Sequence, residues 1–396
     1  MSISIIEAKS AINRQRLPDT FLVSLYRCLA PYRGCGHGCI YCDGRAEKYY
    51  VEGDFEKDIA VRSNLPQLLE RQSEQGFTSR EYGALCIGSG VTDIYQPLEA
   101  IGRITRRMLE ILAKTGLPLV ILTKSSLILR DFDLLKLFPR VLIILTITTL
   151  DQETAGMLEP GASPANERLE IISRAKQEGF LTGVMAMPLC PRLTDQPEQV
   201  KSLFYALKNA GADFIFPGGL TLRPGRQKAL FMELLRKYGK KGLIELYEDV
   251  YRQDKQSGMP LKSYTEPLIR QYSNMLNEMQ MPSMIPHAVY SRILSLPDSL
   301  HVLLSHMQTL YFARQIDINP LKSSAFNYAS WLKANRTSLR RRRKRTQKPF
   351  DITEKLSEML KDCDIKKITG NRKLADFMGE IIHNNSIFDY TGLKLR

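Results

Sequence analysis

The sequence predicts an α/β fold that is built on a parallel sheet or barrel and is followed by a helical extension. Short apolar runs that suit buried strands alternate with helical patterns at least five times between residues 24 and 216. The apolar runs are nearly continuous, as in strands that are covered on both faces of a parallel sheet. From about Gln227 onward, helical patterns dominate as far as about Trp331. These observations favour one α/β core with helices appended to it.

Six segments are predicted as strands of the core, namely 24–28, 82–88, 118–122, 141–147, 182–187 and 214–216. The helices between them are expected at 65–75, 98–114, 167–178 and 197–210. In parallel β/α folds the functional loops follow the carboxyl ends of the strands. We therefore expect the site residues at these strand ends.

The rest of the chain is predicted to be mostly helical. Helices are expected at 229–238, 244–252, 266–279 and 300–312, and again at 353–361 and 373–383. We divide the chain into a core (1–226), a helical extension (227–332), a basic arm or linker (333–350) and a small helical tail (351–396).

Composition places the chain among globular proteins. The 396 residues are 43% hydrophobic, which is enough for a sizeable core. There is no apolar stretch of about 18 residues, so we expect no membrane span. The first residues show no basic region followed by an apolar run, as an export signal would. The seven cysteines form an odd set and suggest no disulfide framework. We therefore expect a cytoplasmic protein.

The net charge of +14 is concentrated in one segment, because nine basic residues and no acidic ones lie between Trp331 and Phe350. Such a segment can neutralise phosphates and bind nucleic acid with salt-dependent affinity. Tyr328, Trp331 and Phe350 are candidates for stacking on bases. A solvated charge run and a partner-binding tail are the alternatives. The candidate nucleic-acid residues are Arg340, Arg341, Arg342, Arg343, Lys344 and Arg345.

Three cysteines follow the first predicted strand at the spacing C-x3-C-x2-C, as Cys35, Cys39 and Cys42. Three thiolates can bind a four-iron cluster and leave one iron open for another ligand, and the glycines between them allow the backbone to turn tightly. Tyr41 can lie beside the ligand of the open iron. A zinc site formed by the three cysteines and His37 is one alternative. A disulfide is another, which the reducing cytosol disfavours.

This loop resembles the signature of the radical S-adenosylmethionine (SAM) enzymes. Further stretches resemble the spore photoproduct lyase-like family within that group, in the same order along the chain. They are 92–99 with 105–106, 123–125 with 130–131, 148–151, 158–160 with 167–169, and 187–191 with 194–195. The resemblance covers about residues 8–260. It implies a partial (βα)6 TIM barrel, a [4Fe-4S] cluster and SAM as cofactors, and an electron donor such as flavodoxin or ferredoxin.

The resemblance also implies roles for single residues. Cys35, Cys39 and Cys42 would bind the cluster. Lys124 would pair with the SAM carboxylate, and Thr146 would offer its hydroxyl to the ribose. The remaining SAM-binding residues implied are Tyr41, Ser89, Gly90, Val184 and Ala186. Structural alternatives are a solvent-facing Lys124, a Thr146 hydroxyl bonded to a neighbouring carbonyl, and core packing of Tyr41.

The sequence departs from the lyase at residues that complete its reaction. The lyase has a hydrogen-donating cysteine where this chain has Gly90, and a tyrosine where it has Asp43. Cys190 follows the fifth strand and is a weak candidate for a donor or ligand, whereas Cys86 is expected in the core. Glu99 and Arg106 are expected to brace a helix.

Three functions follow from these features. The first is a radical SAM enzyme that reductively cleaves SAM to a 5′-deoxyadenosyl radical, which abstracts hydrogen from an unidentified substrate, with nucleic acid the leading candidate. The second is a lyase that repairs DNA as spore photoproduct lyase does. The third is a non-enzymatic iron–sulfur or zinc protein that binds nucleic acid.

Overall fold

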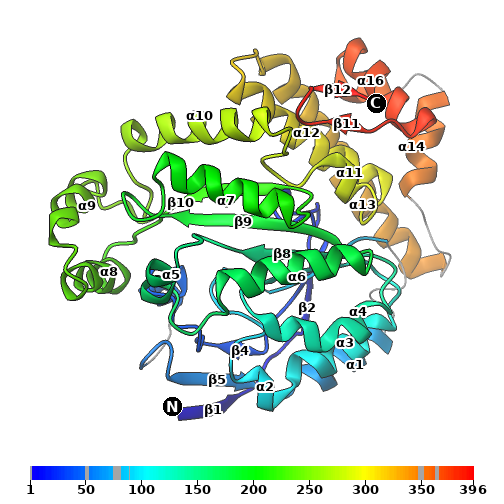
Figure 1. Cartoon of the computed structure of the whole chain (residues 1–396). Helices are drawn as coiled ribbons and strands as arrows, with labels where there is room; N and C mark the ends of the chain where they lie inside the picture. Colours follow the sequence, from blue (N-terminus) through cyan, green and yellow to red (C-terminus); the bar gives the residue numbers. More distant parts are fainter. Residues whose placement is uncertain (1, 50–52, 75–81, 89, 347–351, 362–364) are drawn as a thin grey trace.

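The computed structural model describes residues 2–49, 53–74, 82–88, 90–346, 352–361 and 365–396. At its centre is a seven-stranded sheet with the order β10-β9-β8-β7-β6-β3-β2 (Figure 1). Its strands are β2 (Ile12–Arg14), β3 (Tyr26–Cys28), β6 (Leu85–Ile87), β7 (Leu119–Thr123), β8 (Val141–Thr146), β9 (Leu181–Leu189) and β10 (Ile215–Gly219). The strands from β3 to β10 pair in parallel, and β2 is antiparallel to β3. All six predicted strands are therefore confirmed as neighbours in one parallel sheet.

Strand β9 is longer than predicted, because it continues through Pro188 to Leu189. Proline lacks an N–H and is tolerated in a sheet only where no partner needs that donor. The ladder with β8 ends at Met185, and β10 has a register irregularity between Pro217 and Gly219. Pro188 thus lies where the ladder is already interrupted.

One face of the sheet is covered by the helices that connect its strands. These are α1 (Leu65–Glu74), α3 (Ile104–Ala113), α4 (Phe132–Leu135), α6 (Ala165–Gln177) and α7 (Pro197–Asn209), which lie in front of the sheet in Figure 1. Alternate residues of each strand face this layer, because successive side chains of a strand point to opposite faces. In β7, for example, Leu119 and Ile121 pack in this core cluster.

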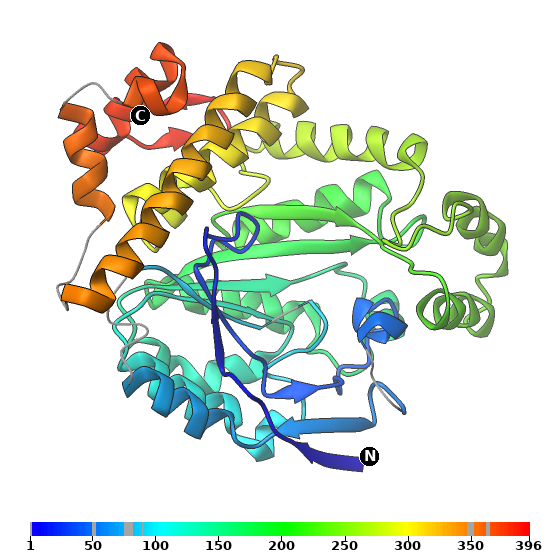
Figure 2. The same ribbon diagram turned by 180° about the vertical axis from the view of Figure 1, so that it is seen from behind.

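The opposite face is covered by the C-terminal helices. These helices include α11 (His287–Tyr290), α12 (Leu296–Ala313) and α13 (Asn319–Thr346); Figure 2, which views the molecule from behind, shows α12 and α13 in front of the sheet. Val120 and Leu142 of the sheet share a core cluster with Leu303 and Tyr328 of these helices. The helical extension is therefore part of the main hydrophobic core.

Helix α13 runs through the segment that the sequence predicts as a basic arm beginning at residue 333. Leu332 is fully buried there, and Arg336 is buried with an ion pair to Asp298 at 2.7 Å. Arg336 also donates to the carbonyl of Arg16 at 3.0 Å. These contacts hold α13 against the core on both sides of the predicted boundary at residues 332–333. The backbone of residues 340–345 therefore forms the last part of this helix and not a separate arm.

The aromatic residues beside the basic run are placed differently from the expectation. Tyr328 is fully buried and donates to the carbonyl of Pro297 at 3.0 Å, so it is not available to stack on a base. Trp331 stacks on the Tyr328 ring, with the ring centres 5.7 Å apart. Phe350 lies outside the described residues.

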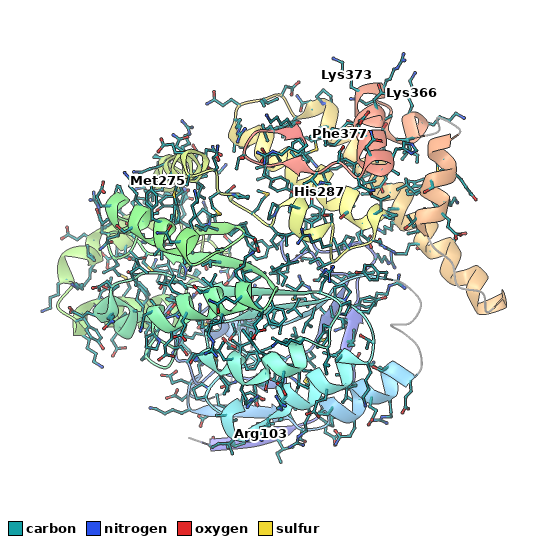
Figure 3. The ribbon with its side chains drawn as sticks, turned by 45° about the vertical axis from the view of Figure 1, so that its right-hand side comes forward. Arg103, Met275, His287, Lys366, Lys373 and Phe377 are labelled. Carbon is teal, nitrogen blue, oxygen red and sulfur yellow. The ribbon has the colours of Figure 1, made fainter. Side chains whose placement is uncertain are left out.

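The tail packs against the same core as the C-terminal helices. It consists of α14 (Ile352–Lys361), α15 (Ile365–Thr369), α16 (Arg372–Asn384), β11 (Phe388–Asp389) and β12 (Lys394–Leu395). Figure 3 shows Phe377 of α16 above His287 of α11. The amide of Phe388 donates to Nδ1 of His287 at 2.9 Å, and the Phe377 and Phe388 rings meet edge to face.

The predicted helix at 98–114 is divided in two. Helix α2 (Glu99–Gly102) ends at Arg103, which has a φ of 50°, and α3 follows directly. The Glu99 carboxylate accepts from the amides of Thr105 (3.0 Å) and Arg106 (3.3 Å), which are free at the start of a helix. The prediction that Glu99 and Arg106 brace a helix is confirmed.

The remaining elements lie around the ends of the sheet. A small sheet of β1 (Ser2–Ile6), β5 (Asp58–Arg62) and β4 (Tyr32–Arg33), which the sequence did not predict, flanks the cysteine loop. The other helices are α5 (Gln152–Leu158), α8 (Arg226–Lys237), α9 (Ile244–Val250) and α10 (Lys262–Glu278), with short 3-10 helices η1 (Asp43–Arg45), η2 (Glu47–Tyr49), η3 (Ser126–Asp131) and η4 (Lys241–Leu243). Within the described ranges, we find no helix with the length and apolar character that a membrane crossing requires.

Candidate active site

The three cysteines of the loop border one cavity. Cys35, Cys39 and Cys42 lie between β4 and η1, and together with Tyr41 they line a cavity of about 330 Å³. The cavity lies at the carboxyl ends of β7, β8 and β9, at the end of the sheet where η1 and η2 approach α8 and α9 in Figure 2. The strand-end residues that line it are Leu122, Thr123, Lys124, Thr146, Met185, Met187 and Pro188.

Several residues that the sequence assigns to SAM are in this cavity. Gly90, Lys124 and Thr146 line it with the cysteines. The structural alternative was that the Thr146 hydroxyl donates to a neighbouring carbonyl. No described residue forms a hydrogen bond with this hydroxyl, so that alternative does not hold. Ser89 lies outside the described residues.

The prediction that Val184 and Ala186 contact SAM is wrong, because neither residue lines the cavity. Both are fully buried in the core between the sheet and its connecting helices. Their neighbours Met185 and Met187 line the cavity instead. Since side chains alternate along a strand, a choice that is wrong by one residue selects the opposite face.

Cys190 was a weak candidate for a hydrogen donor or ligand, and this prediction also needs correction, because its side chain does not line the cavity. It is fully buried beside Phe231 and Tyr247, in the cluster that also contains Cys39 and Tyr41, and its thiol lies 3.8 Å from the carbonyl of Pro188. Burial raises the pKa of this thiol well above its usual range. Cys86 is buried in the sheet core, as expected.

The segment after the second core strand fastens the cysteine loop. Thr92 donates its hydroxyl to the carbonyl of Gly34 at 2.7 Å. The side-chain oxygen of Gln96 accepts from the amide of Gly36 at 2.7 Å. Both loop residues lie close to Cys35. This gives two polar residues of the 92–99 stretch a physical task, which the sequence alone did not show.

His37 is held in the same way. Its Nδ1 lies 2.8 Å from the carbonyl of Gly161, and its Nε2 lies 3.2 Å from Oδ2 of Asp93. Asp93 is buried and also accepts from the hydroxyl of Thr123 and from the amides of Tyr95 and Lys124. Burial would raise the pKa of Asp93, but the hydrogen bond and charge of His37 lower it. Nδ1 of His37 therefore serves the protein framework, and Nε2 lies beside the Asp93 carboxylate.

Arg45 fixes the loop from its other side. The buried guanidinium donates to the carbonyls of Gly38 and Cys39, each at 2.8 Å. It also forms an ion pair with Glu56 at 2.8 Å and lies over the Phe55 ring. An arginine that donates to two carbonyls in one turn holds that turn more rigidly than its glycines would alone. The sequence contained no signal that identified this residue.

Asp43 links the loop to the segment after β10. Its carboxylate accepts from the hydroxyl of Thr221 at 2.8 Å and forms an ion pair with Arg223 at 2.9 Å. Gln227 donates to the backbone carbonyl of Tyr41 at 2.7 Å. Asp43 therefore anchors the cysteine loop to this segment through its carboxylate.

A buried carboxylate organises the charges beside the cavity. Glu159 accepts from the Tyr41 hydroxyl and forms an ion pair with Arg168 at 2.6 Å. Its Oε1 lies 3.8 Å from Nζ of Lys124, and that ammonium lies 5.5 Å from the centre of the Tyr41 ring. Arg168 also donates to the carbonyl of Thr146 at 2.6 Å. Burial would raise the pKa of Glu159, but Arg168 and Lys124 lower it to about 2.

Because the pKa of Glu159 is lowered, we expect the folded protein to lose stability in acid. Its pKa is lower in the folded protein than its ordinary value of 4.5, so its stabilising contribution is complete above pH 4.5 and is lost as the pH falls towards about 2. A shift of this size corresponds to about 3 kcal/mol. We expect the free energy of unfolding of the wild type to fall by about this amount relative to Glu159→Gln over that range. Urea unfolding at stepped pH measures the difference, and a difference that stays constant with pH would contradict the prediction.

The donor set fits a cluster that presents a separate iron to each of three thiolates. The thiols of Cys35, Cys39 and Cys42 border one cavity, and the thiol of Cys42 accepts from the amide of Gly44 at 3.4 Å. Burial raises the pKa of all three thiols, but bound iron would deprotonate them. Among the described residues, no three histidine, cysteine or carboxylate side chains are grouped closely enough to hold one metal ion.

Comparison with known proteins agrees with this geometry. Residues 29–204 match the family model of the radical SAM superfamily. An uncharacterized protein of Mycobacterium tuberculosis is 30% identical over 251 residues, which are 62% of this chain and 72% of that protein. An uncharacterized protein of Methanocaldococcus jannaschii is 32% identical over 192 residues, which are 48% of this chain and 68% of that protein.

Among solved structures, a spore photoproduct lyase variant with bound AdoMet and dinucleoside spore photoproduct superposes with a TM-score of 0.49 and 15% identity. The superposition covers 70% of this chain and 79% of that chain. The chain belongs to the radical SAM superfamily, as its family model and cysteine loop show. Its cofactors are accordingly a [4Fe-4S] cluster and SAM.

Proposed function

We propose that this protein is a radical SAM enzyme that reductively cleaves SAM to a 5′-deoxyadenosyl radical and uses it to abstract hydrogen from a substrate. The observation that carries the proposal is the single cavity that Cys35, Cys39 and Cys42 share with Lys124 and Thr146. A binding protein has no need of a cation and a hydroxyl beside three thiols in a cavity at the strand ends. When bound, the cluster supplies the electron for SAM cleavage.

The protein residues position SAM and keep water out. Lys124 presents an ammonium whose contacts in the described part of the chain are Glu159, at 3.8 Å, and the Tyr41 ring. It therefore has hydrogen-bond capacity left for the SAM carboxylate. Thr146 offers its hydroxyl to the ribose, and Met185 and Met187 provide apolar walls. A largely apolar cavity protects a carbon radical from side reactions.

We further assign the sheet to the partial (βα)6 barrel of the lyase-like family. The six parallel strands run in the order β3, β6, β7, β8, β9, β10, and no described residues pair β3 with β10. The barrel in this assignment is open between those two strands. The 92–99 stretch supports membership of the lyase-like family, because it fastens the cysteine loop through Thr92 and Gln96.

Nucleic acid is the substrate class that we propose first. The support is the net charge of +14 and the basic run at residues 340–345 near the end of helix α13. Arg336 is excluded from this interface, because it is buried against Asp298. We propose an electron donor such as flavodoxin or ferredoxin as partner and the cytoplasm as compartment, where the six described free cysteines remain reduced.

Dimer repair is not part of the proposal. Gly90, at the place of the lyase's cysteine donor, lines the cavity, and no described atom beyond its chain neighbours lies within 4 Å of the Cβ position there. A thiol would fit, but the sequence does not supply one. Asp43 is committed to Thr221 and Arg223 and has no redox chemistry of its own.

The test is formation of 5′-deoxyadenosine. Protein reconstituted anaerobically with iron and sulfide would be given dithionite and SAM, beside a Cys35→Ala/Cys39→Ala/Cys42→Ala variant. We expect product from the wild type, and no product above background from the triple variant. Cys86→Ala is the matched control, because it removes a buried thiol outside the cavity and should retain activity. No product from wild-type protein that carries an intact cluster would contradict the proposal.

A further inference from the structure

A second cavity lies beside the cysteine loop and is lined by arginines. Its volume is about 370 Å³, close to that of the cluster cavity. Strands β2, β3, β4 and β5 contribute side chains to it. Its charged residues are Arg27, Arg33 and Arg62, and no described acidic residue lines it.

Two of these arginines have no counter-charge among the described residues. Arg27 forms an ion pair with Asp19, but neither Arg33 nor Arg62 forms one with any described residue. Arg62 donates to the carbonyls of Ala30 and Tyr32, each at 2.9 Å. Arg33 donates to the carbonyl of Tyr49 at 3.3 Å. Burial lowers the pKa of Arg62, and the charge of Arg33 lowers it further, so the two guanidiniums repel each other.

Two half-buried guanidiniums that face one cavity without a carboxylate are stabilised when an anion lies between them. Guanidinium groups match phosphate oxygens with two parallel hydrogen bonds, which makes arginine a frequent phosphate ligand. Asn13 and Tyr49 also line the cavity and add neutral polar groups. A concave site of this volume is better suited to binding a compact group than to binding the flat surface of a protein partner.

The position of the cavity relates it to the cysteine loop. Thr92 lines both cavities, and Gly34 and Gly44, which line the arginine cavity, flank the cluster cysteines in sequence. Gly44 has no room for a side chain, because a Cβ there would lie 2.5 Å from the carbonyl of Val91. The two cavities are therefore adjacent, with Thr92 as a shared lining residue.

We propose that the cavity of Arg33 and Arg62 binds a phosphate group. The source of this group is either free phosphate or the phosphodiester of a nucleic acid. In the second case the site would hold the backbone of the polymer next to the cavity in which the radical forms. The proposal concerns binding alone, so it stands whether or not 5′-deoxyadenosine is formed.

The experiment is anaerobic calorimetry of the reconstituted protein with inorganic phosphate at constant ionic strength. We expect Arg33→Gln and Arg62→Gln each to weaken binding at least tenfold. Arg33→Lys should bind phosphate with intermediate affinity, because lysine keeps the positive charge but cannot form the two parallel hydrogen bonds of a guanidinium. Arg140→Gln is the matched control, because it removes an exposed arginine at the opposite ends of the strands and should leave the affinity unchanged.

Competition distinguishes the two sources. A short single-stranded oligonucleotide would be titrated into wild type and Arg33→Gln with and without phosphate. Weakening by phosphate in the wild type alone would assign the site to a phosphodiester, and no competition would assign it to free phosphate. Wild-type protein that does not bind millimolar phosphate, or binds it as Arg33→Gln does, would overturn the proposal. Arg33→Gln decides this even if Arg62→Gln fails to fold, because among the described residues the Arg33 side chain makes one hydrogen bond to the framework.

Discussion

Replacing Arg168 with methionine is expected to destabilise the folded protein by about 3–5 kcal/mol. Arg168 and its partner Glu159 are both almost completely buried, and they form an ion pair at 2.6 Å. Without the guanidinium, the one described charge left near the carboxylate is the ammonium of Lys124, at 3.8 Å, together with hydrogen bonds from Tyr41 and Thr148. A buried carboxylate with poor compensation is costly, because it has lost its hydration.

Urea unfolding of the wild type and of Arg168→Met measures this loss. Arg174→Met is the matched control on the same helix, because its ion pair with Glu170 is exposed and should contribute less than about 1 kcal/mol. The double variant Glu159→Gln/Arg168→Met should recover part of the stability, since it leaves no unpaired buried charge. Equal losses for Arg168→Met and Arg174→Met would show that the buried pair has no special importance.

The second large effect is expected on SAM binding. Lys124→Met should raise the dissociation constant for SAM about 10- to 100-fold, because a hydrogen bond to a charged group contributes about 1.5–3 kcal/mol. The Lys124 ammonium lies at the cavity, beside Tyr41 and Glu159. Equilibrium dialysis of the reconstituted protein with labelled SAM measures the constant.

Lys136→Met controls for the loss of one lysine, because this exposed residue pairs with Glu178 away from the cavity. The cluster content of each variant must match, as judged by iron and sulfide analysis. If Lys124→Met binds SAM as tightly as Lys136→Met does, Lys124 does not hold the carboxylate. Its role would then be to balance the charge of Glu159.

The sequence predicted what depends on short-range patterns. The six strands were found because each is a short apolar run between helical patterns, and the cluster cysteines because three thiols lie within eight residues. Lys124 and Thr146 were assigned through the family resemblance, and both line the cavity at the strand ends. Val184 and Ala186 were assigned to the wrong face, because a run that is apolar on both faces does not show which alternate residues face the cavity.

The remaining contacts join residues that are far apart in sequence. Glu159 and Arg168 lie in stretches that resemble the lyase-like family, but nothing in the sequence pairs them with Tyr41 and Lys124. The basic run from residue 333 was predicted as an arm, because it shows neither the burial of Arg336 nor its partner Asp298. A run of basic residues predicts a solvated segment, unless a carboxylate from a distant part of the chain forms an ion pair with one of them.

The way in which the C-terminal helices cover the sheet affects the order of assembly during synthesis. Val120 and Leu142 are buried by residues from α12 and α13, which leave the ribosome long after the strands they cover. Until then one face of the sheet has no apolar cover, and exposed apolar surface of this kind is where nascent chains aggregate. The strands that bear the cavity can therefore reach their final packing only after residues beyond 300 have been translated.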